Sequence, residues 1–193
     1  HHKYFQGAIV DFEKAIEIDS SNSYAYLHRG RVKDKLNNTE AAFQDFEKSI
    51  VLDSNNADAY LERGLLKYKL KDYQSAILDF NKAIAIDTVF SLAYMNRGLV
   101  KHKLKDYAGA LLDNNKAIEL DSTSIQTYIN RGLVKDELDD NTGAIKDCNK
   151  VLELDSNNKW AYNNRGYIKY KLKDYQGALV DLSKAIEIDT NHP

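Results

Sequence analysis

The dipeptide Arg-Gly recurs along this chain at a constant spacing of 34 residues. Its five copies are Arg29-Gly30, Arg63-Gly64, Arg97-Gly98, Arg131-Gly132 and Arg165-Gly166. A period of this length is typical of proteins that stack small units, each of which contacts mainly its neighbours. We therefore expect an array of repeated units rather than a single globular core.

Each repeat contains two stretches in which apolar residues recur at helical spacing. In residues 57–90, these stretches predict a first helix over 58–70 and a second helix over 73–86. Asp72 lies just before the second helix, where a carboxylate can accept from the free backbone amides. The only proline is the last residue, so no proline interrupts the helices. The sequence predicts an all-α fold of eleven helices that begins with a second helix.

The period divides the chain into five full repeats preceded by half a repeat. The half repeat is residues 3–22, and the full repeats 1 to 5 are residues 23–56, 57–90, 91–124, 125–158 and 159–192. The segment His1–Phe5 resembles the end of a purification tag joined to part of a protease site, yet Gln6-Gly7-Ala8 matches Gln176-Gly177-Ala178 of the last repeat. Both origins of His1–Phe5 stay open, and these residues receive no function.

The composition argues against several classes of partner. The net charge is -2, so no basic excess attracts nucleic acid. No apolar run approaches the roughly 20 residues of a membrane-spanning helix, and no signal peptide is visible. Cys148 is the only cysteine, which rules out an intrachain disulfide and is typical of a reducing compartment. We expect a cytoplasmic protein that binds no nucleic acid and does not insert into membranes.

The residue types needed for catalysis are not grouped in this sequence. His28, His102 and His192 fall in different repeats, and no His/Cys cluster has the spacing of metal ligands. No glycine-rich loop is suited to hold a phosphate. Cys148 stands where repeat 2 has Phe80, so we interpret it as a core residue. The expectation is a protein that is not an enzyme and uses neither cofactor nor metal.

Several residues that recur in the repeats carry a family resemblance. In repeat 2 they are Tyr60, Gly64, Tyr73, Ala76, Phe80 and Ala83. This pattern, which covers almost the whole chain, resembles the tetratricopeptide repeat family. The resemblance implies a right-handed superhelix (a solenoid) of antiparallel helix pairs, whose first helices line a concave groove. It also implies a role in binding peptides or partner proteins.

One feature departs from the family pattern, which has an apolar residue where this chain has arginine. The five arginines are Arg29, Arg63, Arg97, Arg131 and Arg165, and a lysine follows each of them by four residues. The second helices supply an acidic series at the same period: Asp11, Asp45, Asp79, Asp113, Asp147 and Asp181. We predict a structural charge ladder of arginine–aspartate pairs, because a guanidinium can bond a carboxylate with two hydrogen bonds. The alternative is an anion-binding track of arginines.

The resemblance further implies which side chains would line the peptide-binding groove. They are the asparagines Asn96, Asn130 and Asn164, the aromatic residues Tyr68, His102, Tyr170 and Trp160, and the lysines Lys69 and Lys103. The asparagines resemble a ladder known from a glycosyltransferase with such repeats, whose amides can bond a peptide backbone. They are alternatively filler beside Arg-Gly, and Trp160 alternatively covers the seam between repeats.

Two classes of function remain open at this point. We favour a scaffold or adaptor that binds an unknown peptide or protein in the groove. The alternative is a regulatory or targeting module of a larger enzyme or secretion-associated protein. The lysine and asparagine positions of the chaperone-binding carboxylate clamp are not matched, so that type of recognition is not expected. Leu179 and Leu182 of the last helix are expected to face a missing neighbour, either because the chain is part of a longer protein or because the ends of two chains associate.

Overall fold

The computed structural model describes residues 2–190, and it describes side chains from Tyr4 to Asp189. His1 therefore lies outside the described residues. So do Asn191 and His192, the last two residues of the expected repeat 5.

Eleven α-helices occupy the described residues. The first helices of the repeats are α2 (Ser23–Lys35), α4 (Ala57–Lys69), α6 (Ser91–Lys103), α8 (Ile125–Glu137) and α10 (Lys159–Lys171). The second helices are α1 (His2–Ile18), α3 (Thr39–Leu52), α5 (Tyr73–Ile86), α7 (Tyr107–Leu120), α9 (Asn141–Leu154) and α11 (Tyr175–Thr190). The predicted all-α class and the number of helices are confirmed. The predicted and observed bounds of α5 coincide, and α4 begins and ends one residue earlier than predicted.

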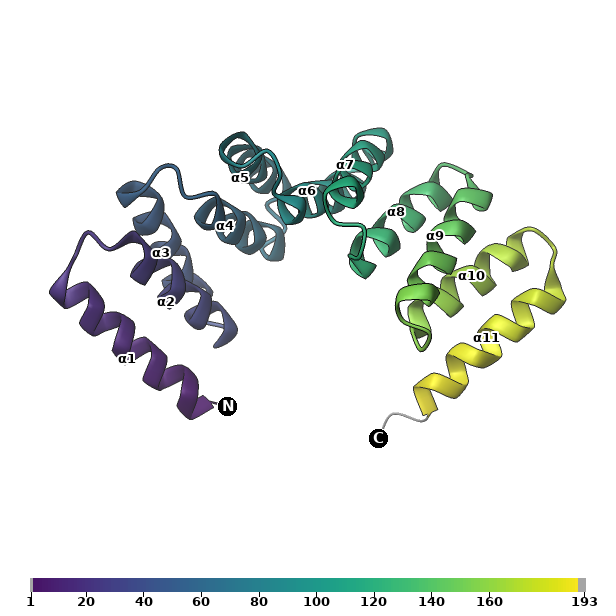
Figure 1. Ribbon diagram of the computed structural model, residues 1–193, viewed down its shortest axis with the longest axis horizontal. Helices are drawn as coiled ribbons and strands as arrows, with labels where there is room; N and C mark the ends of the chain where they lie inside the picture. Colours follow the sequence, from purple (N-terminus) through teal and green to yellow (C-terminus); the bar gives the residue numbers. More distant parts are fainter. Residues whose placement is uncertain (1, 191–193) are drawn as a thin grey trace. The chain divides into compact units, whose positions relative to one another are not determined.

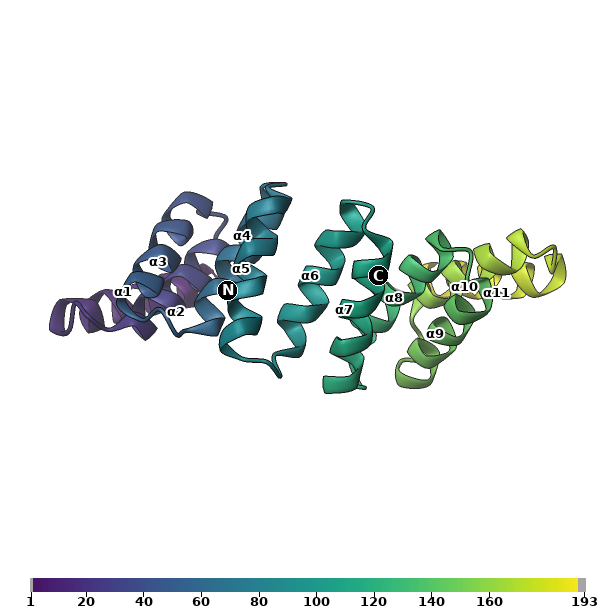
Figure 2. The same cartoon turned by 90° about the horizontal axis from the view of Figure 1, so that it is seen from above.

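The chain divides into two compact halves, an N-terminal half of residues 1–100 and a C-terminal half of residues 101–193. In the N-terminal half, α2 packs against α1 and α3, and α4 packs against α3 and α5. In the C-terminal half, α8 packs against α7 and α9, and α10 packs against α9 and α11 (Figures 1 and 2). Each half is thus a succession of helix pairs in which neighbours in sequence lie side by side.

The turn inside each repeat places a residue other than glycine in the left-handed region. These residues are Asn37, Lys71, Lys105, Asp139 and Lys173, with φ between 59° and 65°. Such a conformation costs roughly 1 kcal/mol for a residue that carries a Cβ. Hydrogen bonds hold the turn: in repeat 2, the Lys71 amide donates to the Tyr68 carbonyl and the Asp72 amide donates to the Lys67 carbonyl. The Asp72 carboxylate then accepts from the Ser75 amide, as the sequence predicts.

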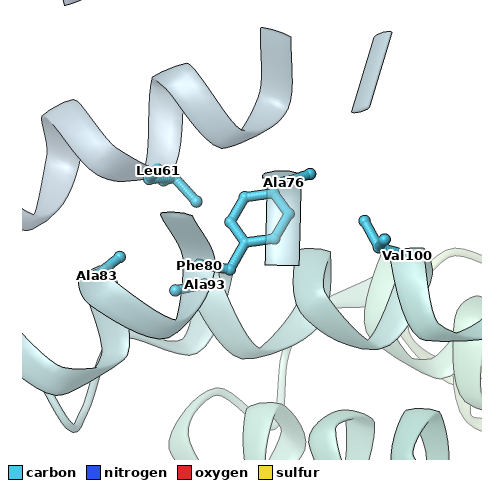
Figure 3. Close-up of a cluster of buried hydrophobic side chains, with 6 residues drawn as sticks. All are labelled: Leu61, Ala76, Phe80, Ala83, Ala93 and Val100. Carbon is cyan, nitrogen blue, oxygen red and sulfur yellow. The ribbon is translucent and has the colours of Figure 1, made fainter. Parts of the chain in front are cut away.

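A phenyl ring fills the centre of repeat 2. Figure 3 shows Phe80 of α5 among Leu61, Ala83 and Ala93, and all of these side chains are buried. A Cβ added to Gly64 would lie only 2.7 Å from the Phe80 ring, so glycine is required where the ring meets α4. The recurring glycine of the first helix therefore makes room for a ring of the second helix.

Candidate functional site

Five aspartates of the predicted series, from Asp45 to Asp181, are buried and bind cations of their own repeat, whereas Asp11 is exposed. In repeat 2, Asp79 is 3% exposed. Arg63 donates to its two oxygens from Nε and a terminal nitrogen at 2.9 Å and 2.7 Å, and Lys67 Nζ lies 2.8 Å from Oδ2. The same arrangement recurs at Asp45, Asp147 and Asp181. The sequence predicts the arginine partner but not the lysine partner. Because both cations bind the same carboxylate, two like charges can stand one helical turn apart.

The ladder arginines make further contacts that the sequence does not reveal. The guanidinium of Arg131 lies 5.4 Å from the centroid of the Tyr128 ring, and the other four arginines lie at 5.4 to 5.7 Å from the tyrosine three residues before them. Arg131 also donates to Asn115 Oδ1 of the preceding second helix, at 2.9 Å. Arg165 bonds Asn149 in the same way. Arg131 and Arg165 thus use three of their five N–H donors on side chains of the protein.

The ionisation of these groups follows from their contacts. The hydrogen bond to Asp181 raises the pKa of Arg165 despite partial burial. Burial alone would raise the pKa of Asp181, but hydrogen bonds from Arg165 and Lys169 outweigh it and hold that pKa below its usual value. The pair is therefore ionised at neutral pH. In repeat 3, Lys101 Nζ lies 2.8 Å from Asp113 Oδ2. The predicted partner Arg97 belongs to the other half of the chain, so the pairing of Arg97 with Asp113 stays a prediction.

In the N-terminal half, the predicted groove residues already have partners within the protein. Lys69 Nζ lies 3.0 Å from Asp34 Oδ1, which links α4 to α2. The Tyr68 ring lies 5.8 Å from the Tyr73 ring. Asn96 donates its side-chain amide to the Leu92 carbonyl of its own helix, at 2.8 Å. Each of these three side chains thus contacts another group of the same half.

In the C-terminal half, the structure separates two of the predicted asparagines by their burial. Asn130 is only 5% exposed, and its Oδ1 accepts from Gln126 Nε2 at 2.9 Å. Its buried Nδ2 has no hydrogen-bond partner among the described residues. Asn164 is half-buried and borders a pocket. Asn130 is thus less accessible than Asn164, and its role in ligand binding stays a prediction.

The remaining predicted groove residues of this half lie at three different places. Tyr170 is exposed, and its ring lies 5.7 Å from that of Tyr175. His102 of α6 makes a similar contact with Tyr107, and burial and the nearby Lys103 lower the pKa of its imidazole. Lys103 itself is exposed. Trp160 borders a separate pocket between α10 and α11, with Leu182 and Ile186.

The C-terminal half contains a cavity of about 220 Å³ between α8, α9 and α10. We call it the repeat-4 pocket. Cys148, Val151 and Ala161 form its buried interior, and Leu133 and Tyr167 are exposed residues of its wall. The other lining residues include Ile129, Gly132, Asp136, Asn164 and Ile168. Cys148 is buried, as its place in the repeat predicts. The cavity beside it was not predicted from the sequence.

The repeat-4 pocket corresponds to the site that Phe80 fills in repeat 2. Adding two periods of 34 residues to the cluster in Figure 3 converts Leu61, Phe80, Ala83, Ala93 and Val100 into Ile129, Cys148, Val151, Ala161 and Ile168. All five of the latter line the pocket. A Cβ added to Gly132 would find no atom closer than 3.5 Å, compared with 2.7 Å at Gly64. The pocket thus lies at the residues equivalent to those that surround Phe80 in repeat 2.

Two kinds of site are not found in the part of the chain that the structure describes. No group of three or more His, Cys, Asp or Glu side chains among these residues is arranged to hold a metal ion. None of the described helices is long and apolar enough to cross a membrane.

Comparison with known sequences identifies the repeats. Family models described as tetratricopeptide repeat match residues 23–56, 57–89, 92–124, 125–158 and 160–192. Among curated protein sequences, none matches the chain significantly.

Solved structures of similar fold were also found. One is YrrB, described as a TPR protein with an unusual peptide-binding site, at 26% identity and a TM-score of 0.76 over 94% of this chain and 93% of that chain. A structure of MamA is 28% identical, with a TM-score of 0.70 over 79% of this chain and 89% of that chain. PilF of Pseudomonas aeruginosa, at 22% identity and a TM-score of 0.79 over 88% of this chain and 77% of that chain, shares the fold.

Proposed function

The chain belongs to the tetratricopeptide repeat family, and we propose that it is a non-enzymatic scaffold or adaptor whose first helices bind a peptide or a partner protein. The observation that carries this proposal is the face of α8 and α10. There, the exposed Tyr167 and Tyr170 and the half-buried Asn164 lie on one first helix, and the repeat-4 pocket lies between that helix and α8. Aromatic side chains beside an apolar pocket with a few polar groups are typical of recognition sites.

The charge ladder supports this proposal, because it separates the arginines that bond within the repeat from the first-helix residues that are available to a ligand. Arg131 uses three of its five donors on aspartate and asparagine side chains, which supports a role of the ladder in stabilising the repeat rather than in contacting a ligand. The variable residues of the first helices are then left to determine what is bound. YrrB, a protein of similar fold that has a peptide-binding site, agrees with this proposal.

Selection from a random peptide library displayed on phage tests the proposal. We expect enriched peptides that bind the purified protein, and we expect the double variant Asn164→Ala/Tyr170→Ala to weaken their binding at least about tenfold, as for residues at the centre of an interface. The matched control is Leu112→Ala, which removes an exposed side chain from the second helix α7. Failure to enrich any peptide, or a larger loss with Leu112→Ala, would contradict the proposal.

Self-association is a second candidate role, favoured by the surface of α11. Leu179, Val180 and Ile186 of this helix are exposed, and Trp160 lies beside Ile186 in the pocket between α10 and α11. Exposed apolar side chains grouped in this way mark contact surfaces. Light scattering over a concentration series measures the association, and a Trp160→Ala/Ile186→Ser variant should shift it toward the monomer. A strict monomer at high concentration would exclude this role.

A further inference from the structure

We propose that the repeat-4 pocket binds one aromatic side chain of phenylalanine type from the peptide or protein held on the first-helix face. That a bound peptide or protein supplies the ring rests on the proposed function. That the occupant is a ring rests on the pocket alone. It names the anchor residue that a ligand of this protein should carry.

The repeat itself is built around a ring. Repeats 1 and 2 place Phe46 and Phe80 directly after the ladder aspartate, and both rings are buried against a glycine of the first helix. Repeat 4 keeps the glycine, the aspartate and the surrounding apolar residues but has Cys148 in place of the ring. Because close packing is the rule in protein interiors, a pocket at the position of a buried ring favours a ring as its occupant.

The size and chemistry of the pocket interior also suit a ring. An apolar cavity of about 150 Å³ is sufficient to bind benzene, and the repeat-4 pocket has about 220 Å³. Val151 replaces the smaller Ala83 of repeat 2, so part of the space left by the ring is already taken. Burial raises the pKa of the Cys148 thiol to about 11, so this side chain is uncharged at neutral pH. The interior is therefore apolar and selects against charged side chains.

The mouth of the pocket lies on the proposed ligand face. The exposed lining residues Leu133 and Tyr167 belong to α8 and α10, the first helices that carry this face. Asn164 contributes a side-chain amide to the same lining, and an amide can both donate to and accept from a peptide backbone. Asp136 completes the polar part of the wall and pairs with Lys171 Nζ at 2.6 Å. A ring that enters this mouth would place its own backbone next to polar groups.

A titration with two small probes tests the inference without any knowledge of the natural ligand. N-acetyl-phenylalaninamide carries the ring, and N-acetyl-alaninamide is the matched probe without it. In methyl-labelled protein, we expect the first probe to shift the signals of Ile129, Val151 and Ile168 with a dissociation constant on the order of 1 mM. The second probe should leave these signals unchanged.

Variants that fill or preserve the pocket make the test specific. The double variant Cys148→Phe/Val151→Ala restores the ring and the small neighbour of repeat 2, and it should weaken the probe at least about tenfold. Val151→Ala alone is the matched control and should still bind. If the double variant does not fold, Cys148→Leu replaces it, because repeat 5 carries Leu182 at the equivalent position.

Three outcomes would overturn the inference. They are no saturable shift in the wild type, shifts centred on Leu182 and Ile186 instead, and unchanged binding in the filled variant. The library experiment separates this inference from the proposed function. Selected peptides that depend on Asn164 and Tyr170 but bind the filled variant as tightly as the wild type would refute the ring site alone. A bound probe without any selected peptide would refute the peptide-binding function and leave the pocket as a ring-binding site.

Discussion

Repeat 2 in the N-terminal half and repeat 4 in the C-terminal half share one scaffold and differ at its centre. Both hold a buried aspartate, Asp79 or Asp147, between an arginine and a lysine at nearly the same distances. The next residue is Phe80 in repeat 2 and Cys148 in repeat 4, and a filled core becomes a cavity of about 220 Å³. The ion pairs thus maintain the repeat, while the adjacent residue determines whether the repeat offers a pocket.

The largest expected difference between the two repeats concerns truncation of the central residue. Phe80→Ala should lower the free energy of unfolding of repeat 2 by about 3–5 kcal/mol, because a fully buried ring is removed. Cys148→Ala should cost less than about 1 kcal/mol, because the thiol already borders an empty space and contributes few contacts. Native-state hydrogen exchange, read helix by helix, measures the two values in one array. Equal losses of unfolding free energy in the two variants would show that repeats 2 and 4 are packed equally well around their central residues.

The ladder should behave alike in both repeats. Asp79→Ala and Asp147→Ala should each cost about 3 kcal/mol, the low end for a broken buried pair, because the partner cations retain some contact with solvent. Glu47→Ala is the matched control: this exposed carboxylate lies 3.8 Å from Arg63, and its loss should cost less than about 0.5 kcal/mol. Thermal and chemical unfolding of the three variants check the expectation. A loss in one repeat only would refute a shared role for the ladder.

Repeat 3 extends the comparison, because the residue after its ladder aspartate is Asn114. This side chain is 0% exposed, and neither of its amide atoms has a hydrogen-bond partner among the described residues. Asn114→Leu should raise the free energy of unfolding by about 1 kcal/mol, since an unsatisfied buried amide is replaced by an apolar side chain of similar volume. The melting temperature measures the gain. A lower melting temperature would indicate that the amide is satisfied in solution.

The period of 34 residues made the helices and their order predictable from the sequence alone. Apolar spacing locates α5 because helix formation here depends on one buried face, which the sequence displays directly. The arginine–aspartate pairs were also predictable, since two charged series share the period. The third partner, Lys67, and the ring of Tyr60 under Arg63 were not, because those contacts depend on side-chain directions within the packed repeat.

The candidate site was less predictable than the fold. The resemblance placed Asn130 and Asn164 at equivalent groove positions, but burial of Asn130 by its own repeat removes it from the surface. Cys148 was visible as a change from Phe80, yet a change of residue reveals a cavity only when the surrounding side chains are known to stay in place. The glycine contacts give that information: a Cβ added at Gly132 would be at ordinary contact distance from Asp147, whereas one added at Gly64 would clash with the Phe80 ring.

The stability of the Cys148→Phe/Val151→Ala variant, which gives repeat 4 the central residues of repeat 2, decides whether the repeat-4 pocket is a vacant ring site. If it is, hydrogen exchange of the amides in α8, α9 and α10 should report a gain of about 1 kcal/mol in local opening free energy, as for other cavity-filling changes. Val151→Ala alone should lower the same quantity. A double variant that is less stable than Val151→Ala would mean that repeat 4 has no room for the ring, and the pocket would not be the site of a missing side chain.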